Sequence, residues 1–304
     1  MIEQHLKIKP EVGSALAANR PVVALESTVI AHGLPRPQNL ETAKRLEEIV
    51  RATGATPATV AMLSGTLHAG LEDSQLELLA ESDDIKKLSV RDLAIGVAGE
   101  WHGATTVAST MWIAHRAGIT VFATGGIGGI HRGSLPDVSA DLPQLAQTPM
   151  IVVCSGAKIV LNLPATREWL ETNSVTVVGY QCDELPAFYS KSSGLPVDIT
   201  CDSPADVVRI FKTQRELDLP AALLVTVPIP GDAEVASATL NAVLDDALTQ
   251  AAREYITGRN LTPFLLARMS EGSHGATLRA NIALLENNAR VAAQIAVALC
   301  SANC

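Results

Sequence analysis

The sequence has few aromatic residues and no long hydrophobic run. Only 3% of its 304 residues are Phe, Trp or Tyr, whereas 47% are hydrophobic, so Ala, Val, Ile and Leu carry the apolar content. This mix favours a sheet covered by helices over a β-sandwich. No apolar run reaches the roughly 18 residues that span a bilayer. We therefore expect no membrane partner.

Paired cysteines and a leader-like segment are also missing. The five cysteines are odd in number and widely spaced, with no Cys-x-x-Cys pair. This pattern disfavours a disulfide framework and a zinc ribbon, and it fits reduced thiols in a cytosol. The first residues show no basic region followed by an apolar stretch, so we expect no signal peptide and a cytoplasmic location.

Positive charge is scarce. Lys and Arg number 23 against 32 Asp and Glu, which gives a formal net charge of -9. Nucleic acids bind through basic surfaces, so we expect no nucleic-acid partner. The length suits one large α/β domain or two small ones.

Apolar runs alternate with segments of helical periodicity along the whole chain. The expected strands cover residues 21–25, 58–63, 119–123, 150–154, 175–179 and 221–227, and the main expected helices cover about 38–53, 91–99, 203–217 and 277–299. A capping box at 74–77 predicts a further short helix. The alternation predicts a single domain, residues 1–304, of class α/β: three α/β/α layers with a largely parallel central sheet. Ligands of such folds gather at the carboxyl ends of the strands.

A glycine-rich run follows the expected strand 119–123. Residues 124–133 read Thr-Gly-Gly-Ile-Gly-Gly-Ile-His-Arg-Gly. Glycine lets another molecule approach the main chain closely, so we interpret the run as a platform for an anionic or polar ligand, with a tight turn as the alternative. A dinucleotide fingerprint would need a third glycine where His131 stands, which argues against an NAD site.

Lys158 follows the expected strand 150–154 in the turn Ser-Gly-Ala-Lys. We expect it near the start of a helix. A lysine amine is nucleophilic only when neutral, and partial burial and the positive end of a helix both favour that form. The alternatives are a surface lysine and a Ser155-x-x-Lys158 hydrolase pair, whose usual companion motifs are absent.

Carboxylates follow two of the expected strands. Glu26 comes directly after strand 21–25 and is a candidate general acid, or else a solvated or helix-capping group. Asp137, Ser139 and Asp141 provide oxygen ligands of the kind that Mg²⁺ or Mn²⁺ prefers, although Asp141 is equally suited to an N-cap.

Two further sets of polar residues each allow two interpretations. The segment around Ser89 and Arg91, preceded by Lys87, suits a phosphate or a solvated face. Amides on the last expected helix, at 281, 287 and 288, suit base recognition or a polar surface.

Taken together, these segments resemble the pseudouridine-5′-phosphate glycosidase family. The matching segments span nearly the whole chain in the family's order: 22–28, 32–39, 91–93, 103–111, 122–133, 138–142, 156–158, 228–230, 262–268 and 281–282.

The resemblance implies an α/β/α fold, a homotrimer and reversible cleavage of pseudouridine 5′-phosphate to uracil and ribose 5-phosphate. It implies that Lys158 is the nucleophile, forming a Schiff base with ring-opened ribose, and that Glu26 is the proton donor. It also implies one Mn²⁺ or another divalent cation per subunit, held by Asp137 largely through waters. The implied substrate contacts are Lys87, Thr106, Val107, His131, Ser139, Ala140, Asp141 and Asn281.

Three alternatives stay open at this point. Ser155, and Thr226-Val227 before Pro228, depart from the family pattern and leave room for a related C-nucleoside substrate. A hydrolase using Ser155 and Lys158 is the second alternative, and a non-catalytic phosphosugar-binding module is the third.

Overall fold

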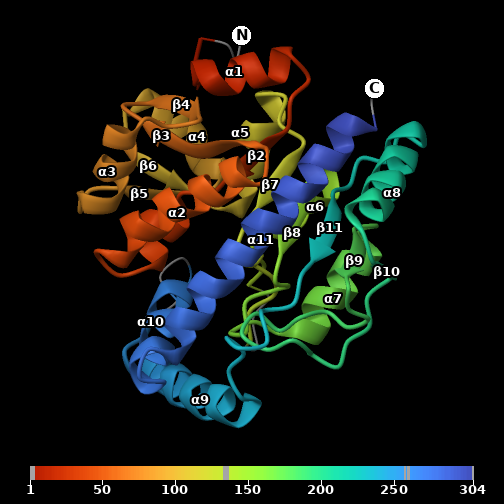
Figure 1. The fold of residues 1–304 in the computed structure, drawn as a ribbon. Helices are drawn as coiled ribbons and strands as arrows, with labels where there is room; N and C mark the ends of the chain where they lie inside the picture. The colour runs from red at the N-terminus through yellow and green to blue at the C-terminus, as the bar shows by residue number, and fades with distance from the viewer. Residues whose placement is uncertain (1–3, 133–136, 257, 259–260, 303–304) are drawn as a thin grey trace.

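A mostly parallel sheet runs through the middle of the molecule, with helices on both faces (Figure 1). The computed structural model describes residues 4–132, 137–256, 258 and 261–302. The central strands lie in the order β2, β7, β8, β11, β9 and β10, and every neighbouring pair among them is parallel. Their bounds are Val22–Leu25, Val121–Ala123, Ile151–Cys154, Leu223–Thr226, Thr176–Tyr180 and Ile199–Cys201.

The sheet continues on the other side of β2 with short strands of mixed direction. β3 (Thr56–Leu63) pairs parallel to β2 and antiparallel to both β4 (Thr66–Ala69) and β6 (Gly103–Thr105). β1 (Leu6–Ile8) pairs with β4, and β5 (Lys86–Leu88) pairs with β6. The predicted parallel sheet is confirmed. The sequence analysis missed these edge strands because three or four residues are too few to show a period.

Helices form a layer on each side of the sheet. On one face α11 packs against both α2 and α8. Helix α11 crosses in front of the sheet in Figure 1. On the other face α4, α5, α6 and α7 pack in succession. The bounds are Ala276–Ser301 for α11, Gln38–Ala52 for α2, Pro204–Glu216 for α8, Val90–Ala98 for α4, Val107–Arg116 for α5, Asp141–Gln147 for α6 and Leu163–Thr172 for α7. The predicted three layers are confirmed.

The remaining helices lie at the ends of the sheet. They are α1 (Pro10–Ala17), α3 (Asp73–Glu81), α9 (Ser237–Arg253), α10 (Leu261–Gly272) and a π-helix, η1 (Val29–Gly33). Among the described residues, no helix combines the length and the apolar character needed to cross a membrane.

Local sequence patterns predicted the start of α8 correctly and the start of α3 incorrectly. The helix expected from residue 203 is confirmed, because the Ser203 hydroxyl is the N-cap of α8 and accepts a hydrogen bond from the Asp206 N–H at 3.3 Å. The predicted box at 74–77 is wrong in register. Glu72 is the N-cap of α3, and its own N–H donates to the Gln75 side chain at 2.9 Å. A carboxylate can cap as a hydroxyl does, so Glu72 takes the place predicted for the serine.

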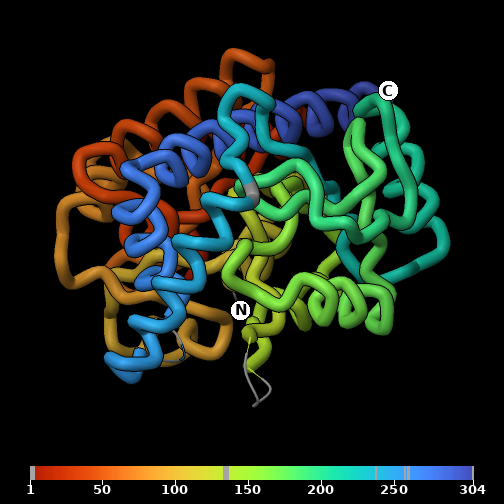
Figure 2. Tube along the Cα trace, turned by 90° about the horizontal axis from the view of Figure 1, so that it is seen from below, coloured from red at the N-terminus to blue at the C-terminus, as the bar shows by residue number. Residues whose placement is uncertain are grey.

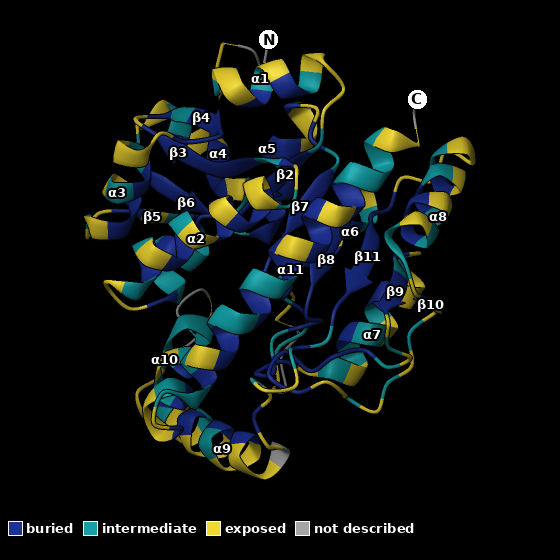
Figure 3. Cartoon of the chain, in the orientation of Figure 1, coloured by how far each residue is buried: buried dark blue, intermediate teal, exposed yellow. Residues whose placement is uncertain are grey.

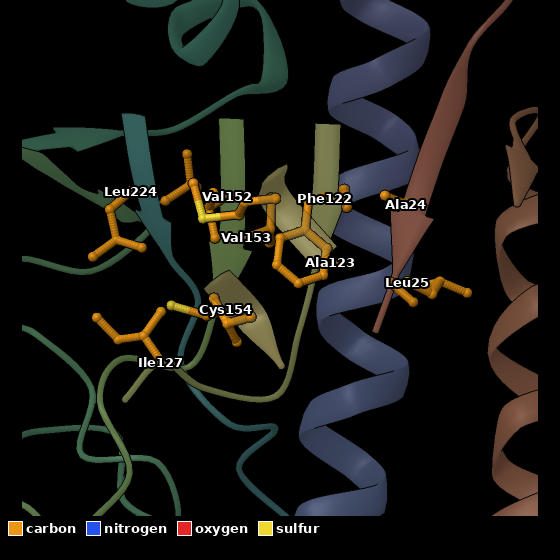
Figure 4. Packing of buried hydrophobic residues seen from close by; sticks show 14 of the residues in the cluster. Ala24, Leu25, Phe122, Ala123, Ile127, Val152, Val153, Cys154 and Leu224 are labelled. Atoms are coloured by element: carbon orange, nitrogen blue, oxygen red, sulfur yellow. The ribbon is translucent and has the colours of Figure 1, made fainter. Parts of the chain in front are cut away.

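The core lies along the central strands. Figure 4 shows Leu25 from β2, Phe122 from β7, Val152 from β8 and Leu224 from β11 packed side by side. Figure 3 shows these strands buried, whereas the helices bury one side and expose the other. Strands covered on both faces need continuous apolar runs, which explains why the apolar runs of the sequence located them.

The loops that follow the central strands leave at one end of the sheet. Glu26 follows β2, the glycine run follows β7, and Lys158 follows β8. Helices α9 and α10 lie at the same end (Figure 1), and Figure 2 looks onto this end from below. The parallel topology therefore brings three separate segments together.

Candidate active site

Two adjoining cavities lie at this end of the sheet. We call the larger, of about 350 Å³, the outer lobe, and the smaller, of about 60 Å³, the inner lobe. Both are lined by Glu26, Thr28, Lys87, Lys158 and Thr262. The outer lobe adds Ser89, Arg91, Thr106, Val107, Gly128, His131, Asp137, Val138, Ser139, Ala140, Asp141, Leu161 and Gly258. The inner lobe adds Val29, His32, Gly33, Gly125, Gly126, Phe188, Pro263, Leu266, Asn281 and Leu285.

Glu26 is buried where the two lobes meet. Its side chain accepts a hydrogen bond from the Thr124 hydroxyl. Burial raises the pKa of the Glu26 carboxyl, and the positive charge of Lys158 only partly opposes that rise. The residue is 8% exposed, which rules out the solvated alternative. A carboxyl in this position keeps its proton at a higher pH than an ordinary glutamic acid, as a proton donor must.

Lys158 lies in a loop, so its predicted place at a helix start is wrong. Helix α7 begins only at Leu163, where the Asn162 side chain accepts from the Ala165 N–H at 3.1 Å. The glycine run holds Lys158 instead, because the Lys158 N–H donates to the Ile127 carbonyl at 3.2 Å. Among the described groups, Lys158 has the largest charge effect on Glu26. The two predicted reacting groups are therefore neighbours.

The glycine run packs too tightly for side chains. A Cβ on Gly128 would lie 2.2 Å from the Ser139 hydroxyl oxygen and 2.7 Å from Asp141 Oδ2. The protein's own segment 139–141 therefore makes the close approach to the main chain at Gly128. The run also lines both lobes, through Gly125 and Gly126 in one and Gly128 in the other. Gly133, the last residue of the run, lies outside the described residues.

Asp141 joins the glycine run to helix α5. Its two carboxylate oxygens accept from the Ala108 N–H at 2.9 Å and from the Gly128 N–H at 2.8 Å. Of the alternatives for Asp141, the N-cap is not the one found, because Ala140 is the N-cap of α6 and Asp141 is its first residue. Backbone donors from two distant segments bind the carboxylate instead.

The outer lobe is built for an anion. The side chains of Lys87, Arg91 and Lys158 line it, and so do Ser89 and Thr106, the N-caps of α4 and α5. Helix N-termini and cationic side chains both attract phosphate. Both interpretations of the segment around Ser89 stay open, because Arg91 lines the lobe although its side chain is 74% exposed.

The expected metal site has few ligands. Asp137 is exposed, and its carbonyl accepts from the His131 N–H at 2.9 Å. Burial lowers the pKa of His131, while the charge of Asp137 opposes that effect. No group of three or more His, Cys, Asp or Glu within the described ranges could hold a metal ion. One exposed carboxylate fits a hard cation that keeps most of its waters, and it does not fit a protein cage.

Ser155 is not placed as a nucleophile. It is fully buried, and its hydroxyl bonds to the Asn288 amide, with Oγ to Oδ1 at 3.2 Å. Ser155 lines neither lobe, whereas Lys158 lines both. The geometry therefore does not support a hydrolase pair.

Asn288 holds the glycine run in place from helix α11. It is fully buried, and its Nδ2 donates to the Thr124 carbonyl at 2.9 Å and to the Ser155 hydroxyl at 3.1 Å. We predict that Asn288→Ala lowers the free energy of unfolding by about 1–3 kcal/mol, because buried acceptors lose their donor. Urea unfolding measures this loss.

The neighbouring Asn287 provides the control for that prediction. Among the described residues its amide donates one long hydrogen bond, 3.4 Å to the Pro228 carbonyl, and the side chain is half-buried. Asn287→Ala should change stability by no more than about 0.5 kcal/mol. Equal losses in the two variants would contradict the role given to Asn288.

Every residue to which the family resemblance gives a role lines at least one of the lobes, whereas Ser155, Asn287 and Asn288 line neither. Asn281 lines only the inner lobe, whereas Asp137 and His131 line only the outer lobe. Contact of these residues with substrate stays a prediction. The sequence analysis gave no role to Thr28, His32 or Phe188. The only signal for His32 was its place in a segment that resembles the family.

The family model described as indigoidine synthase A like protein matches residues 11–298. The chain belongs to this family, which is the pseudouridine-5′-phosphate glycosidase family of the predicted resemblance, and it is an enzyme.

The relatives match over nearly the whole chain. A pseudouridine-5′-phosphate glycosidase of Methylobacterium nodulans is 50% identical, covering 97% of this chain and 88% of the relative. One of Solibacter usitatus is 48% identical, covering 97% of this chain and 99% of the relative.

Two solved structures share the fold. The prealnumycin C-glycosynthase AlnA, in complex with ribulose 5-phosphate, superposes with a TM-score of 0.91 at 40% identity, covering 99% of this chain and 98% of that one. An indigoidine synthase A-like protein of Thermotoga maritima superposes with a TM-score of 0.89 at 35% identity, covering 97% and 96%.

Proposed function

We propose that this enzyme reversibly cleaves the C–C glycosidic bond of pseudouridine 5′-phosphate, giving uracil and ribose 5-phosphate. The observation that carries the proposal is the position of Glu26 and Lys158 at the boundary between the two lobes. The names of the relatives support the substrate. The ribulose 5-phosphate bound to the C-glycosynthase supports a pentose phosphate ligand.

The two lobes differ in polarity, as do the phosphate and the base of this substrate. The outer lobe offers Lys87, Arg91 and Lys158 and two helix N-termini to the phosphate, although carboxylates also line it. The inner lobe presents the apolar side chains of Phe188, Leu266 and Leu285 beside the Asn281 amide, which suits a flat ring with polar edges. The anomeric carbon would then lie between the lobes, next to Glu26 and Lys158.

The bond to be broken explains why a lysine is needed. A C-glycoside has no leaving oxygen or nitrogen to protonate, so a pair of carboxylates cannot cleave it in the usual way. The neutral Lys158 amine attacks C1′, and the C1′–O4′ bond breaks as Glu26 gives its proton to O4′. The ribose ring is then open and covalently bound to Lys158.

Release of uracil follows from the nitrogen that is now on C1′. That nitrogen first gives a proton to the Glu26 carboxylate, which frees its lone pair. The lone pair then forms a C=N bond, the C1′–C5 bond breaks, and C5 of uracil keeps the electron pair and takes the proton from Glu26. Water then adds to the Schiff base, which frees ribose 5-phosphate and the Lys158 amine. The net reaction consumes one water, and each step is reversible.

The test of this proposal is uracil release from pseudouridine 5′-phosphate, followed by chromatography. We expect release from the nucleotide. The kcat/KM for unphosphorylated pseudouridine should be lower by about 100-fold or more, because the outer lobe then has no phosphate to bind. Release from neither compound, or equal rates for both, would contradict the proposal.

We also propose that a divalent cation such as Mn²⁺ binds beside Asp137, with waters completing its coordination. When bound, it would offset negative charge near the substrate phosphate. Removal with a chelator should raise KM for the nucleotide, and Asp137→Asn should lower the Mn²⁺ affinity measured by calorimetry. Unchanged Mn²⁺ binding in Asp137→Asn would place the cation elsewhere.

A related C-nucleoside remains the second candidate substrate. The likeness to a C-glycosynthase favours it. Offering other ring nucleophiles with ribose 5-phosphate would show whether uracil is preferred. A homotrimer stays a prediction of the family resemblance, which light scattering would test.

A further inference from the structure

Two polar atoms in the wall of the inner lobe have no partner within the protein. The Thr28 hydroxyl oxygen and the His32 Nε2 are buried, and neither has a hydrogen-bond partner among the described residues. Both residues line the inner lobe. Glu26, two residues before Thr28, does have a partner in Thr124. Buried polar atoms are nearly always satisfied, so two orphans in one small cavity call for a ligand that supplies the partners.

The fold fixes these two residues firmly. They lie on the segment from β2 into the π-helix η1, and turns of this kind occur often at functional sites. The Ser27 carbonyl accepts from the Ile30 N–H at 3.0 Å, and the Asn39 amide donates to the Ile30 carbonyl at 3.0 Å. The backbone of the segment that carries Thr28 and His32 is therefore held in place, while the two buried side-chain atoms lack a partner among the described residues.

The surroundings assign the tautomer of His32. The Ile85 backbone opposes the fall of the His32 pKa, which is the effect of a carbonyl that accepts from a ring N–H. Because Nε2 has no partner, that donor is Nδ1. Burial lowers the pKa of His32, and the nearby charge of Lys87 lowers it further, so the ring is neutral at pH 7. A neutral ring with its proton on Nδ1 presents Nε2 as an acceptor.

We propose that Thr28 and His32 read the base in the inner lobe: His32 Nε2 accepts a hydrogen bond from a ring N–H, and the Thr28 hydroxyl bonds to a neighbouring polar group of the ring. This inference rests on the proposed function for the identity of the base. A base linked through carbon keeps both of its ring N–H groups, which an acceptor can recognise. A ring with a bare nitrogen at that position leaves His32 unpaired and binds more weakly.

The test is uracil affinity by calorimetry, in enzyme that carries Lys158→Met so that no bond forms. The matched pair is His32→Asn, whose amide reaches only as far as Nδ1, and His32→Gln, whose amide oxygen reaches as far as Nε2. We expect about tenfold weaker uracil binding for His32→Asn and less than about threefold for His32→Gln. Thr28→Val should weaken binding and Thr28→Ser should not.

Methylated bases and ribose 5-phosphate complete the test. One of 1-methyluracil and 3-methyluracil should bind at least about tenfold more weakly than uracil, and this difference should vanish in His32→Asn. The inference fails if His32→Asn binds uracil normally, if uracil does not bind, or if His32→Asn weakens ribose 5-phosphate binding equally, which would indicate a structural role. If uracil binding behaves as expected but the nucleotide is not cleaved, the proposed function fails and the base-reading role stands.

Discussion

Replacing Lys158 by Arg is expected to lower kcat for pseudouridine 5′-phosphate cleavage by about 10⁴-fold or more. A guanidinium keeps the positive charge beside Glu26 but does not attack carbon at neutral pH. Losses of this size are typical when a covalent nucleophile is removed. Lys158→Met should be equally inactive, because the missing property is the amine and not the charge. Uracil release under saturating substrate measures the effect.

Binding separates this chemical loss from a structural one. The inhibition constant of ribose 5-phosphate should rise by less than about tenfold in Lys158→Arg, because Lys87 and Arg91 still line the outer lobe. Lys7→Met, an exposed lysine on β1, should keep full activity. A Lys158→Arg enzyme with a tenth of the normal rate would show that Lys158 binds the substrate without attacking it.

Replacing Glu26 by Gln is expected to lower cleavage by about 10²–10⁴-fold, the range for a general acid. The amide can still accept from Thr124 but cannot give a proton to the ring oxygen. Burial raises the pKa of Glu26, so the donor is protonated below that raised value and lost as the pH rises through it. The wild-type cleavage rate should therefore fall on the alkaline side, and the fall should be absent from the residual rate of Glu26→Gln.

The same carboxyl makes stability depend on pH. The folded protein holds this proton more tightly than the unfolded chain does, so stability decreases as the pH rises from the ordinary value of 4.5 through the raised one. Glu26→Gln removes the buried charge and should unfold at a higher temperature than wild type at pH of about 8.5. The difference should shrink at pH of about 5.5. A constant difference would mean that Glu26 carries no buried charge.

Short continuous apolar runs made the centre of the fold predictable. Strands β2, β7, β8 and β11 are buried on both faces, so each one is continuous in the sequence. Parallel strands end at one edge of the sheet, which is why the expected meeting of Glu26 with Lys158 could be inferred. The edge strand β5, which carries Lys87, has only three residues and no such signal.

Hydrogen bonds that the sequence pattern did not reveal explain where Asp141 and Lys158 lie in the structure. Local rules left Asp141 as a cation ligand or a helix cap, but N–H groups of Ala108 and Gly128 bind its carboxylate. Lys158 was expected at a helix start, but the cap at Asn162 sets that start later. The orphan atom of His32 depends on a π-helix, for which there is no period to read.

Borohydride trapping tests the central claim most directly. Wild-type enzyme is incubated with ribose 5-phosphate, reduced with borohydride, digested and examined by mass spectrometry. The Schiff-base mechanism predicts one reduced pentose phosphate on the peptide that contains Lys158, and none on that peptide in Lys158→Arg. An unmodified Lys158 in enzyme that releases uracil under the same conditions, or an adduct on another lysine, would contradict it.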